Sequence, residues 1–204
     1  MTAPEALDRG LAQLALELPG GARDKLLQYV ALLEKWNRTF NLTAIRNPVE
    51  MVSHHLLDSL VVVPHLPMPA AAATLADVGS GAGLPGAPLA IACPQWQVTL
   101  NDSNQKKTAF LRQAAIELRL RNVSVHEGRV QDWHPAQRFA VVISRAFAEL
   151  SEFIAACRHL VAPGGVLAAM KGAAPARSDA GRVIPLEVPL LNAERHLVLV
   201  PVGS

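Results

Sequence analysis

Four glycines lie close together in residues 77–86, and they are the strongest chemical signal in the sequence. A short apolar run precedes them, and a stretch rich in Ala, Leu and Ile follows. A strand, a glycine loop and a helix in this order allow the backbone to approach a ligand closely, with the N-terminus of the helix facing that ligand. Glycine is needed there because a side chain would block the approach and because such turns use positive φ angles. The segment therefore predicts a ligand-binding turn at the carboxyl end of a strand.

Two classes of ligand fit this loop. Residues 81–86 satisfy the dinucleotide pattern G-x-G-x-x-G. Residues 77–83 resemble the D-x-G-x-G-x-G loop of Rossmann-like methyltransferases that use S-adenosylmethionine (SAM). Asp102 ends the next apolar run, about 20 residues further on, where an acidic side chain can accept hydrogen bonds from ribose hydroxyl groups. Because both NAD and SAM carry a ribose, Asp102 does not decide between them.

Composition limits the class of protein. The chain has 204 residues, of which 50% are hydrophobic and 18% charged, enough apolar material for one domain with an extension. A net charge of +2 permits a nucleic-acid partner without requiring one. The sequence shows no secretory signal pattern and no apolar run of membrane-spanning length, and its two cysteines lack metal-ligand spacing. We therefore expect a soluble cytoplasmic protein with neither a metal site nor a disulfide framework.

The first third of the chain is predicted to be helical. Apolar residues at helical spacing indicate one helix over residues 4–18 and a stronger one over residues 22–40. Trp36 and Phe40 end the apolar stripe of the second helix, and we interpret them as core residues rather than as a surface for stacking bases. Residues 1–66 are accordingly predicted to form a helical extension packed on the main domain.

A third helix is expected to begin after Asn47, whose side chain can cap it, and to run to about residue 63. His54 and His55 lie three to four residues before Asp58 in this helix, so each histidine shares a face with that carboxylate. Local hydrogen bonds are the expected role of the three side chains, rather than a metal site. A Pro- and Ala-rich linker follows at residues 64–73.

Strands and helices alternate in the rest of the chain, which predicts an α/β fold with a doubly wound, mostly parallel sheet over residues 67–204. Strands are expected at 74–78, 98–100, 122–126, 139–144, 166–170, 183–188 and 196–200, helices after the glycine loop and at 103–118 and 150–160, and a flexible loop at 173–182. In such sheets, ligands bind beyond the carboxyl ends of the strands. The glycine loop, Asp102, residues 128–132 and residues 144–145 are all predicted to lie at that edge.

Several blocks of sequence, read in order, carry a more specific signal. They are His55–Leu60, Asp77–Gly86, Asp102–Ser103 with Lys106–Lys107, Gly128–Val130, Ile143–Phe147, Met170–Gly172 and Glu194–Leu197. Together they resemble the bacterial family of small-subunit ribosomal RNA methyltransferases called RsmG, formerly glucose-inhibited division protein B. The resemblance extends from about residue 26 to residue 200.

The resemblance implies a Rossmann-like class I SAM-dependent methyltransferase that modifies N7 of one guanine in 16S ribosomal RNA. It implies SAM as cofactor, 16S rRNA or the small ribosomal subunit as partner, no metal or membrane partner, and a monomer. Arg129 and Arg145 are the implied catalytic residues. The implied cofactor-binding residues are Asp77, Gly79, Ser80, Gly81, Gly83, Leu84, Asp102, Ser103, Arg129, Val130, Gln131 and Arg145. Gln131 stands where the family often has an acidic residue, and Asn101 where an apolar residue is usual.

Methylation of guanine N7 makes modest chemical demands. N7 has an in-plane lone pair and carries no proton, so no general base is required. The sequence Ser-Arg-Ala-Phe at 144–147 stands where exocyclic amine methyltransferases have an Asp/Asn-Pro-Pro-aromatic motif. We therefore hypothesise that Arg129 and Arg145 hold an RNA phosphate or guanine O6. The alternative role for Arg145 is a salt bridge to Asp77 or Asp102.

Three other functions remain open at the level of sequence. An NAD-dependent oxidoreductase would need a substrate domain, for which the chain leaves little room. A non-catalytic RNA-binding assembly factor would have no use for the four glycines of residues 77–86. A small-molecule methyltransferase is disfavoured only by the wider pattern of blocks.

Overall fold

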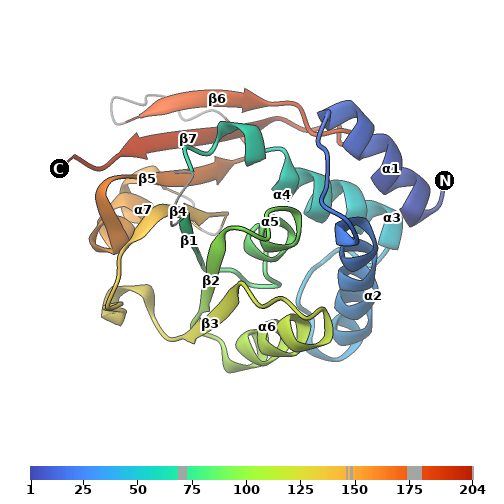
Figure 1. Ribbon diagram of the computed structural model, residues 1–204, viewed down its shortest axis with the longest axis horizontal. Coiled ribbons are helices and arrows are strands. Elements are labelled where there is room, and N and C mark those ends of the chain that lie inside the picture. The colour runs from blue at the N-terminus through green and yellow to red at the C-terminus, as the bar shows by residue number, and fades with distance from the viewer. Residues whose placement is uncertain (69–72, 146, 148, 174–180, 204) are drawn as a thin grey trace.

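The computed structural model describes residues 1–68, 73–145, 147, 149–173 and 181–203. In this part of the chain the strands form one seven-stranded sheet with the order β3-β2-β1-β4-β5-β7-β6 (Figure 1). Strands β1 to β5 are parallel to one another, whereas β7 is antiparallel to both β5 and β6. The strands are β1 (Thr74–Val78), β2 (Gln97–Asp102), β3 (Val123–Glu127), β4 (Phe139–Ser144), β5 (Val161–Lys171), β6 (Arg182–Leu186) and β7 (Arg195–Pro201).

Helices cover both faces of the sheet. The α-helices are α1 (Ala3–Leu14), α2 (Ala22–Phe40), α3 (Pro48–Met51), α4 (Asp58–Leu60), α5 (Gly86–Ala92), α6 (Gln105–Glu117) and α7 (Leu150–Cys157). A π-helical segment, η1 (Val52–Leu57), joins α3 to α4, and short 3₁₀ segments are η2 (Val63–His65), η3 (Val130–Asp132) and η4 (Arg158–Leu160). No helix among the described residues is long and apolar enough to cross a membrane.

Side-chain alternation along the strands builds a core on each face. Leu75 of β1 belongs to the core cluster that includes residues of α1, α2, η1, α5 and α6, whereas Ala76 and Val78 of the same strand belong to the cluster that includes residues of η3 and α7. Figure 1 shows the N-terminal helices on the same side of the sheet as α5 and α6, with α7 on the other. The doubly wound sheet predicted from the sequence is therefore confirmed, and so are the helices that precede it.

Two helix predictions need correction. The first helix ends at Leu14 rather than residue 18, because Ala15 adopts a left-handed conformation with φ 50° and turns the chain. The third helix starts as predicted, since the Asn47 side chain accepts the Val49 N–H at 2.9 Å. It then changes to π-helix over Val52–Leu57 and ends at Leu60. Such π-turns interrupt helices preferentially at functional sites.

Strand β5 is longer than its apolar run indicated. It begins at Val161 rather than residue 166, so Pro163–Gly165 lie inside the strand, at a register shift opposite Phe139 and Val141. Most of the predicted loop at 173–182 and part of the predicted linker at 64–73 lie outside the described residues.

The aromatic end of α2 is only partly as expected. Trp36 packs edge-on against Phe110 of α6, with ring centroids 5.6 Å apart, so its predicted core role is confirmed. Phe40 contacts the Trp36 ring but is 38% exposed, so the prediction that it is a core residue is wrong. Its exposure follows from its position as the last residue of the helix.

Candidate active site

Three cavities lie in a row along the carboxyl edge of the parallel strands. Cavity A, of about 380 Å³, is lined by Val78, Gly79, Asn101, Asp102, Ser103, Lys107, Gly128, Arg129, Val130, Gln131 and Phe147. Cavity B, of about 190 Å³, is lined by Leu42, Thr43, His55, Gly79, Ser80, Gly81, Ala82, Leu84 and Arg145. Cavity C, of about 370 Å³, is lined by Ile45, His54, His55, Asp58, Arg145, Met170, Lys171, Gly172 and Arg195. Gly79 belongs to both A and B, whereas His55 and Arg145 belong to both B and C, so the three cavities adjoin.

The buried carboxylate of Asp77 fixes the glycine loop between β1 and α5 through hydrogen bonds. One oxygen of this fully buried carboxylate accepts the Ser80 hydroxyl at 2.5 Å and the Gly86 N–H at 2.8 Å. Burial raises the Asp77 pKa to about 6, and these two hydrogen bonds oppose the rise. Asp77 lines none of the three cavities, so it stabilises the loop without being exposed to a ligand bound in them.

Gly86 is required by packing rather than by its φ angle. A Cβ atom here would overlap the Leu100 side chain of β2 and lie 2.8 Å from the Cβ of Asp77. The start of α5 therefore approaches the sheet more closely than any side chain would allow.

Replacing Gly86 by alanine should lower the free energy of unfolding by about 1–3 kcal/mol, because the added methyl group overpacks this contact. Urea unfolding measures the effect. Gly20→Ala is the matched control, since a Cβ at Gly20 would meet nothing within 4 Å. Its effect should stay within about 0.5 kcal/mol, and equal stability of the two variants would contradict the packing role of Gly86.

Asp102 connects the glycine loop to the end of β2. Its carboxylate accepts the Gly81 N–H at 2.9 Å through one oxygen and the Asn104 N–H at 2.8 Å through the other. Each carboxylate oxygen can accept a further hydrogen bond. The side chain lines cavity A, where that remaining capacity is available to a ligand.

Asn101 has a structural function. Its amide group donates to the backbone oxygen of Gly128, just beyond the end of β3, at 2.9 Å, and to that of His126, within β3, at 3.3 Å. Its own backbone oxygen accepts the Ser80 N–H at 2.9 Å. Asn101 thus joins the glycine loop, β2 and β3 at the base of cavity A.

Tyr29 ties the N-terminal helices to the same loop. This residue of α2 is fully buried, and its hydroxyl donates to the backbone oxygen of Ala82. Burial raises the pKa of the phenol, so it remains a donor.

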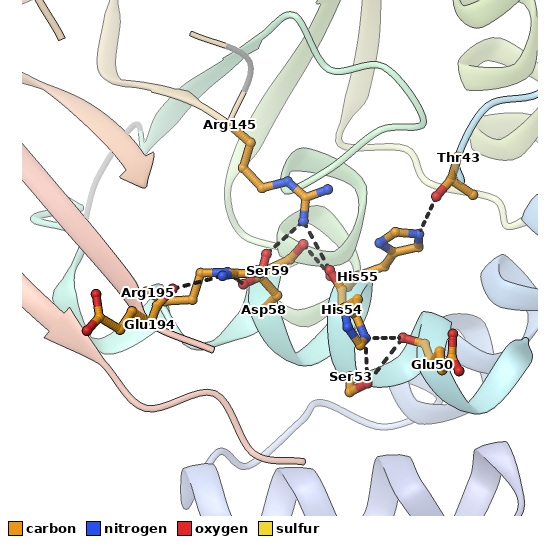
Figure 2. Close-up of polar contacts among 10 residues, drawn as sticks. All are labelled: Thr43, Glu50, Ser53, His54, His55, Asp58, Ser59, Arg145, Glu194 and Arg195. Atoms are coloured by element: carbon orange, nitrogen blue, oxygen red, sulfur yellow. Dashed lines mark hydrogen bonds and ion pairs between the residues drawn. The ribbon is translucent and has the colours of Figure 1, made fainter. Parts of the chain in front are cut away.

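Arg145 belongs to an ion-pair cluster that joins η1, α4, β4 and β7 (Figure 2). Its Nη1 donates to an Asp58 oxygen at 2.7 Å and to the backbone oxygen of His54 at 3.2 Å. Nε of Arg195 donates to the other Asp58 oxygen at 2.8 Å. The Asp58 residue is only 3% exposed, so it holds two guanidinium groups from inside the protein. The predicted ion pair of Arg145 with Asp77 or Asp102 is therefore wrong, because Asp58 occupies that role.

Of the three side chains expected to make local hydrogen bonds, His54 does so, whereas His55 bonds to Thr43, 12 positions away, and Asp58 pairs with distant arginines. Nδ1 of His54 lies 3.1 Å from the backbone oxygen of Glu50, and Nε2 of His55 lies 2.9 Å from the Thr43 hydroxyl. Burial, with the nearby Arg145 charge, lowers the His55 pKa to about 4. Among the described residues no group of three or more His, Cys, Asp or Glu side chains could hold a metal ion.

The structure distributes the predicted site residues over the row of cavities. Asp102, Ser103, Arg129, Val130 and Gln131 line cavity A. Ser80, Gly81 and Leu84 line cavity B, Gly79 lines both A and B, and Arg145 lies at the B–C junction. Gly83 lines none of the three, and the two arginines predicted to act together line different cavities.

Sequence reasoning left several cavity residues out of the predicted site. They are Thr43, His55, Asp58, Lys107, Phe147, Lys171 and Arg195. Most of them lie in the sequence blocks that carry the family resemblance, so membership of these blocks could have identified them as site residues.

The strand order, the antiparallel β7, the glycine loop after β1 and the acid at the end of β2 define the fold of class I SAM-dependent methyltransferases. A solved SAM-dependent methyltransferase from Aquifex aeolicus has a similar fold, with a TM-score of 0.56 and 17% sequence identity. The similarity covers 74% of this chain and 92% of that one. The predicted fold class is confirmed.

The sequence itself is much closer to one family. A family model described as rRNA small subunit methyltransferase G (GidB) matches residues 22–181. Ribosomal RNA small subunit methyltransferase G of Chromobacterium violaceum is 54% identical, covering 94% of each chain. Its namesake in Burkholderia thailandensis is 53% identical, covering 94% of this chain and 88% of the relative. The chain belongs to this methyltransferase family, which confirms the resemblance and favours a methyltransferase over an oxidoreductase or a non-catalytic assembly factor.

Proposed function

We propose that this protein transfers a methyl group from SAM to N7 of a specific guanine in 16S ribosomal RNA. The observation that supports the proposal most strongly is the continuous row of cavities. Residues of the glycine loop line cavities A and B, and a cluster of cationic side chains lines cavity C. Two substrates bound from the two ends would meet at Arg145 and His55. The printed names of the relatives support ribosomal RNA of the small subunit as the acceptor.

The residues around cavities A and B fit SAM. Cavity A is of the size of many ligand pockets, and the spare acceptor capacity of Asp102 suits ribose hydroxyl groups. Val130 and Gln131 border the same cavity and would contact the adenine. The backbone of Gly79–Gly81 offers close approach to the rest of the cofactor. SAM supplies a methyl group on a positively charged sulfur, which is the electrophile of the reaction.

The chain needs only to position the acceptor base and to exclude water. Guanine N7 already has the lone pair that attacks, so no residue has to remove a proton. Well-oriented proximity can contribute about 7–11 kcal/mol to the lowering of the barrier. Arg145, fixed by Asp58, would hold guanine O6 or a phosphate at the B–C junction. Arg129 would hold a phosphate, or part of the cofactor, beside cavity A.

Cavity C is the part of the row suited to RNA. Arg145, Arg195 and Lys171 bring three cationic side chains to it, against the single carboxylate of Asp58. Cationic side chains contribute most of the sequence-independent affinity for nucleic acid. We further propose that the protein acts as a cytoplasmic monomer, and that residues 1–66 form an extension that braces the methyltransferase domain of residues 67–204.

Methyl-labelled SAM tests the proposal directly. The purified protein is offered unmodified small ribosomal subunits and naked 16S rRNA, and the labelled nucleosides are identified by mass. Label in 7-methylguanosine at one site is the expected result. Label in another nucleoside would overturn the N7 assignment, and failure of the protein to bind SAM would overturn the cofactor.

A further inference from the structure

His55 presents a hydrogen-bonding group that the protein itself does not use. The residue is 5% exposed, and its Nδ1 atom is buried without a hydrogen-bond partner among the described residues. An unpaired buried polar atom costs about 1–3 kcal/mol. The ring borders cavities B and C, where the two substrates of the proposed reaction would meet. In Figure 2 one ring nitrogen is directed to Thr43, and the other is on the side of Arg145.

The contacts of Thr43 decide which ring nitrogen carries the proton. The Thr43 oxygen accepts the Ile45 N–H at 3.2 Å, and its only other contact in the described chain is His55 Nε2 at 2.9 Å. Within the described part of the protein, the hydroxyl proton has an acceptor only if it donates to Nε2. Since this imidazole is neutral above a pH of about 5, its proton must then be on Nδ1. Nδ1–H is therefore a buried donor without an acceptor.

We propose that His55 Nδ1–H donates to O6 of the target guanine and thereby selects guanine as the acceptor base. The inference rests on the proposed function and assigns to it a specificity-determining residue. The N7 edge of guanine carries two acceptors, N7 and O6, whereas adenine presents an N6 amino donor in place of O6. A hydrogen-bond donor placed next to N7 can therefore bind O6 of guanine, but it would face the N6 amino donor of adenine.

Arg145 completes a donor pair at this place. Its Nη1 is occupied by Asp58 and by the backbone oxygen of His54, whereas Nε and Nη2 have no partner within the described part of the chain. A neutral histidine beside the arginine adds a second donor without adding a second positive charge. That matters here because methylation at N7 makes the base itself cationic. Adenine would leave the buried Nδ1–H of His55 unpaired, and a site that leaves its own buried polar groups unpaired rejects a ligand strongly.

The donor is held in place from the N-terminal helices. Asn37 of α2 accepts the Thr43 N–H at 2.9 Å and donates to the backbone oxygen of Ile45 at 3.3 Å. These bonds fix the short segment that carries the Thr43 hydroxyl. Thr43 is thus a positioning residue, because it orients His55 and sets its tautomer.

His55→Ala should lower kcat/KM for methyl transfer to rRNA about 10- to 100-fold, as expected when one buried hydrogen bond to the base is lost. The dissociation constant for SAM, measured by calorimetry, should stay within about twofold of the wild type, because the donor serves the base and not the cofactor. His134→Ala is the matched control, since His134 is exposed and lines none of the three cavities. Unchanged kcat/KM in a folded His55→Ala variant, or a weakened SAM affinity that accounts for its loss, would overturn the proposal.

A base analogue tests O6 itself. 2-Aminopurine keeps N7, has hydrogen in place of O6 and lacks the N1 proton of guanine, and splinted ligation can place it at the methylated position of the rRNA. The replacement should cost the wild type about 10- to 100-fold in kcat/KM and the His55→Ala variant at least about fivefold less, because the two changes remove one interaction. Equal losses in both proteins would overturn the proposal even if the wild type makes 7-methylguanosine. A wild type that makes none would overturn the proposed function instead.

Variants of Thr43 test the tautomer. Thr43→Val removes the hydroxyl group at nearly constant shape, so Nδ1–H is no longer enforced and kcat/KM should fall several-fold. Thr43→Ser keeps the hydroxyl and should restore at least half of the wild-type kcat/KM. If serine and valine behave alike, the hydroxyl does not orient His55, and the assignment of Nδ1 as donor fails.

Discussion

Asp58→Ala should lower the rate of methyl transfer by about 100-fold, the size of effect that a misplaced catalytic group produces. Asp58 touches neither substrate in the proposed mechanism and acts through Arg145 and Arg195, both of which it binds within 2.8 Å. Without the carboxylate, two neighbouring cations repel one another. Their side chains are 28% and 25% exposed, so both can turn towards solvent and leave cavity C. Single-turnover kinetics with SAM and rRNA would measure the change.

A double-mutant cycle separates positioning from general damage. If Asp58 acts through Arg145, Asp58→Ala should add less than about threefold to the loss already caused by Arg145→Ala. Asp8→Ala is the matched control. Asp8 also forms an ion pair with an arginine, Arg23 at 2.6 Å, but this pair is exposed to solvent. The control should retain full activity. Full activity of a folded Asp58→Ala variant, or independent losses in the cycle, would refute the positioning role.

The cost of Asp58→Ala to stability should be moderate. Removal of one partner of a fully buried ion pair costs about 3–5 kcal/mol, but both arginines here are partly exposed, so water can replace much of what is lost. We expect a decrease of about 1–2 kcal/mol in the free energy of unfolding after this screening is allowed for. Activity measured well below the unfolding temperature therefore reports on the site and not on unfolded protein.

The sequence predicted the parts of this fold whose signals are local. The strand of residues 74–78, the glycine loop and the acid at 102 are contiguous patterns, and each has the predicted place in the structure. The Asn47 cap was also predictable, because a cap needs only a side chain and the next few backbone amides. Adjacent local patterns of this kind were enough to determine a parallel sheet and the edge at which its ligands bind.

The site itself depends on contacts that no local pattern contains. Asp58 and Arg195 are 137 positions apart, and the antiparallel placement of β7 beside β5 brings the arginine to α4. Local spacing therefore does not reveal the true partner of Arg145, although it does place Asp58 on the same helical face as His55. The early end of the first helix was missed for another reason, because Ala15 carries none of the usual signals of a left-handed cap.

Two buried titratable groups of the site should act on stability in opposite directions as pH changes. The Asp77 pKa is raised from 3.8 to about 6, so the folded protein binds more protons than the unfolded chain between those values. The free energy of unfolding contributed by Asp77 therefore falls as pH rises through that window. The His55 pKa is lowered from 6.5 to about 4, so here the unfolded chain binds more protons. The contribution of His55 therefore rises with pH between about 4 and 6.5.

Single substitutions should reveal the two opposing slopes. Asp77→Asn keeps an oxygen for the Ser80 hydroxyl and the Gly86 N–H but does not titrate, so its stability relative to wild type should increase between pH 5 and pH 8 by about 1–2 kcal/mol. His55→Gln should lose stability relative to wild type over the same range, by a similar amount. Urea unfolding at several pH values measures both, and subtracting the wild-type curve cancels the other groups. Parallel curves for either variant would mean that its group titrates alike in the folded and unfolded chains, and that burial at the glycine loop or beside Arg145 does not perturb it.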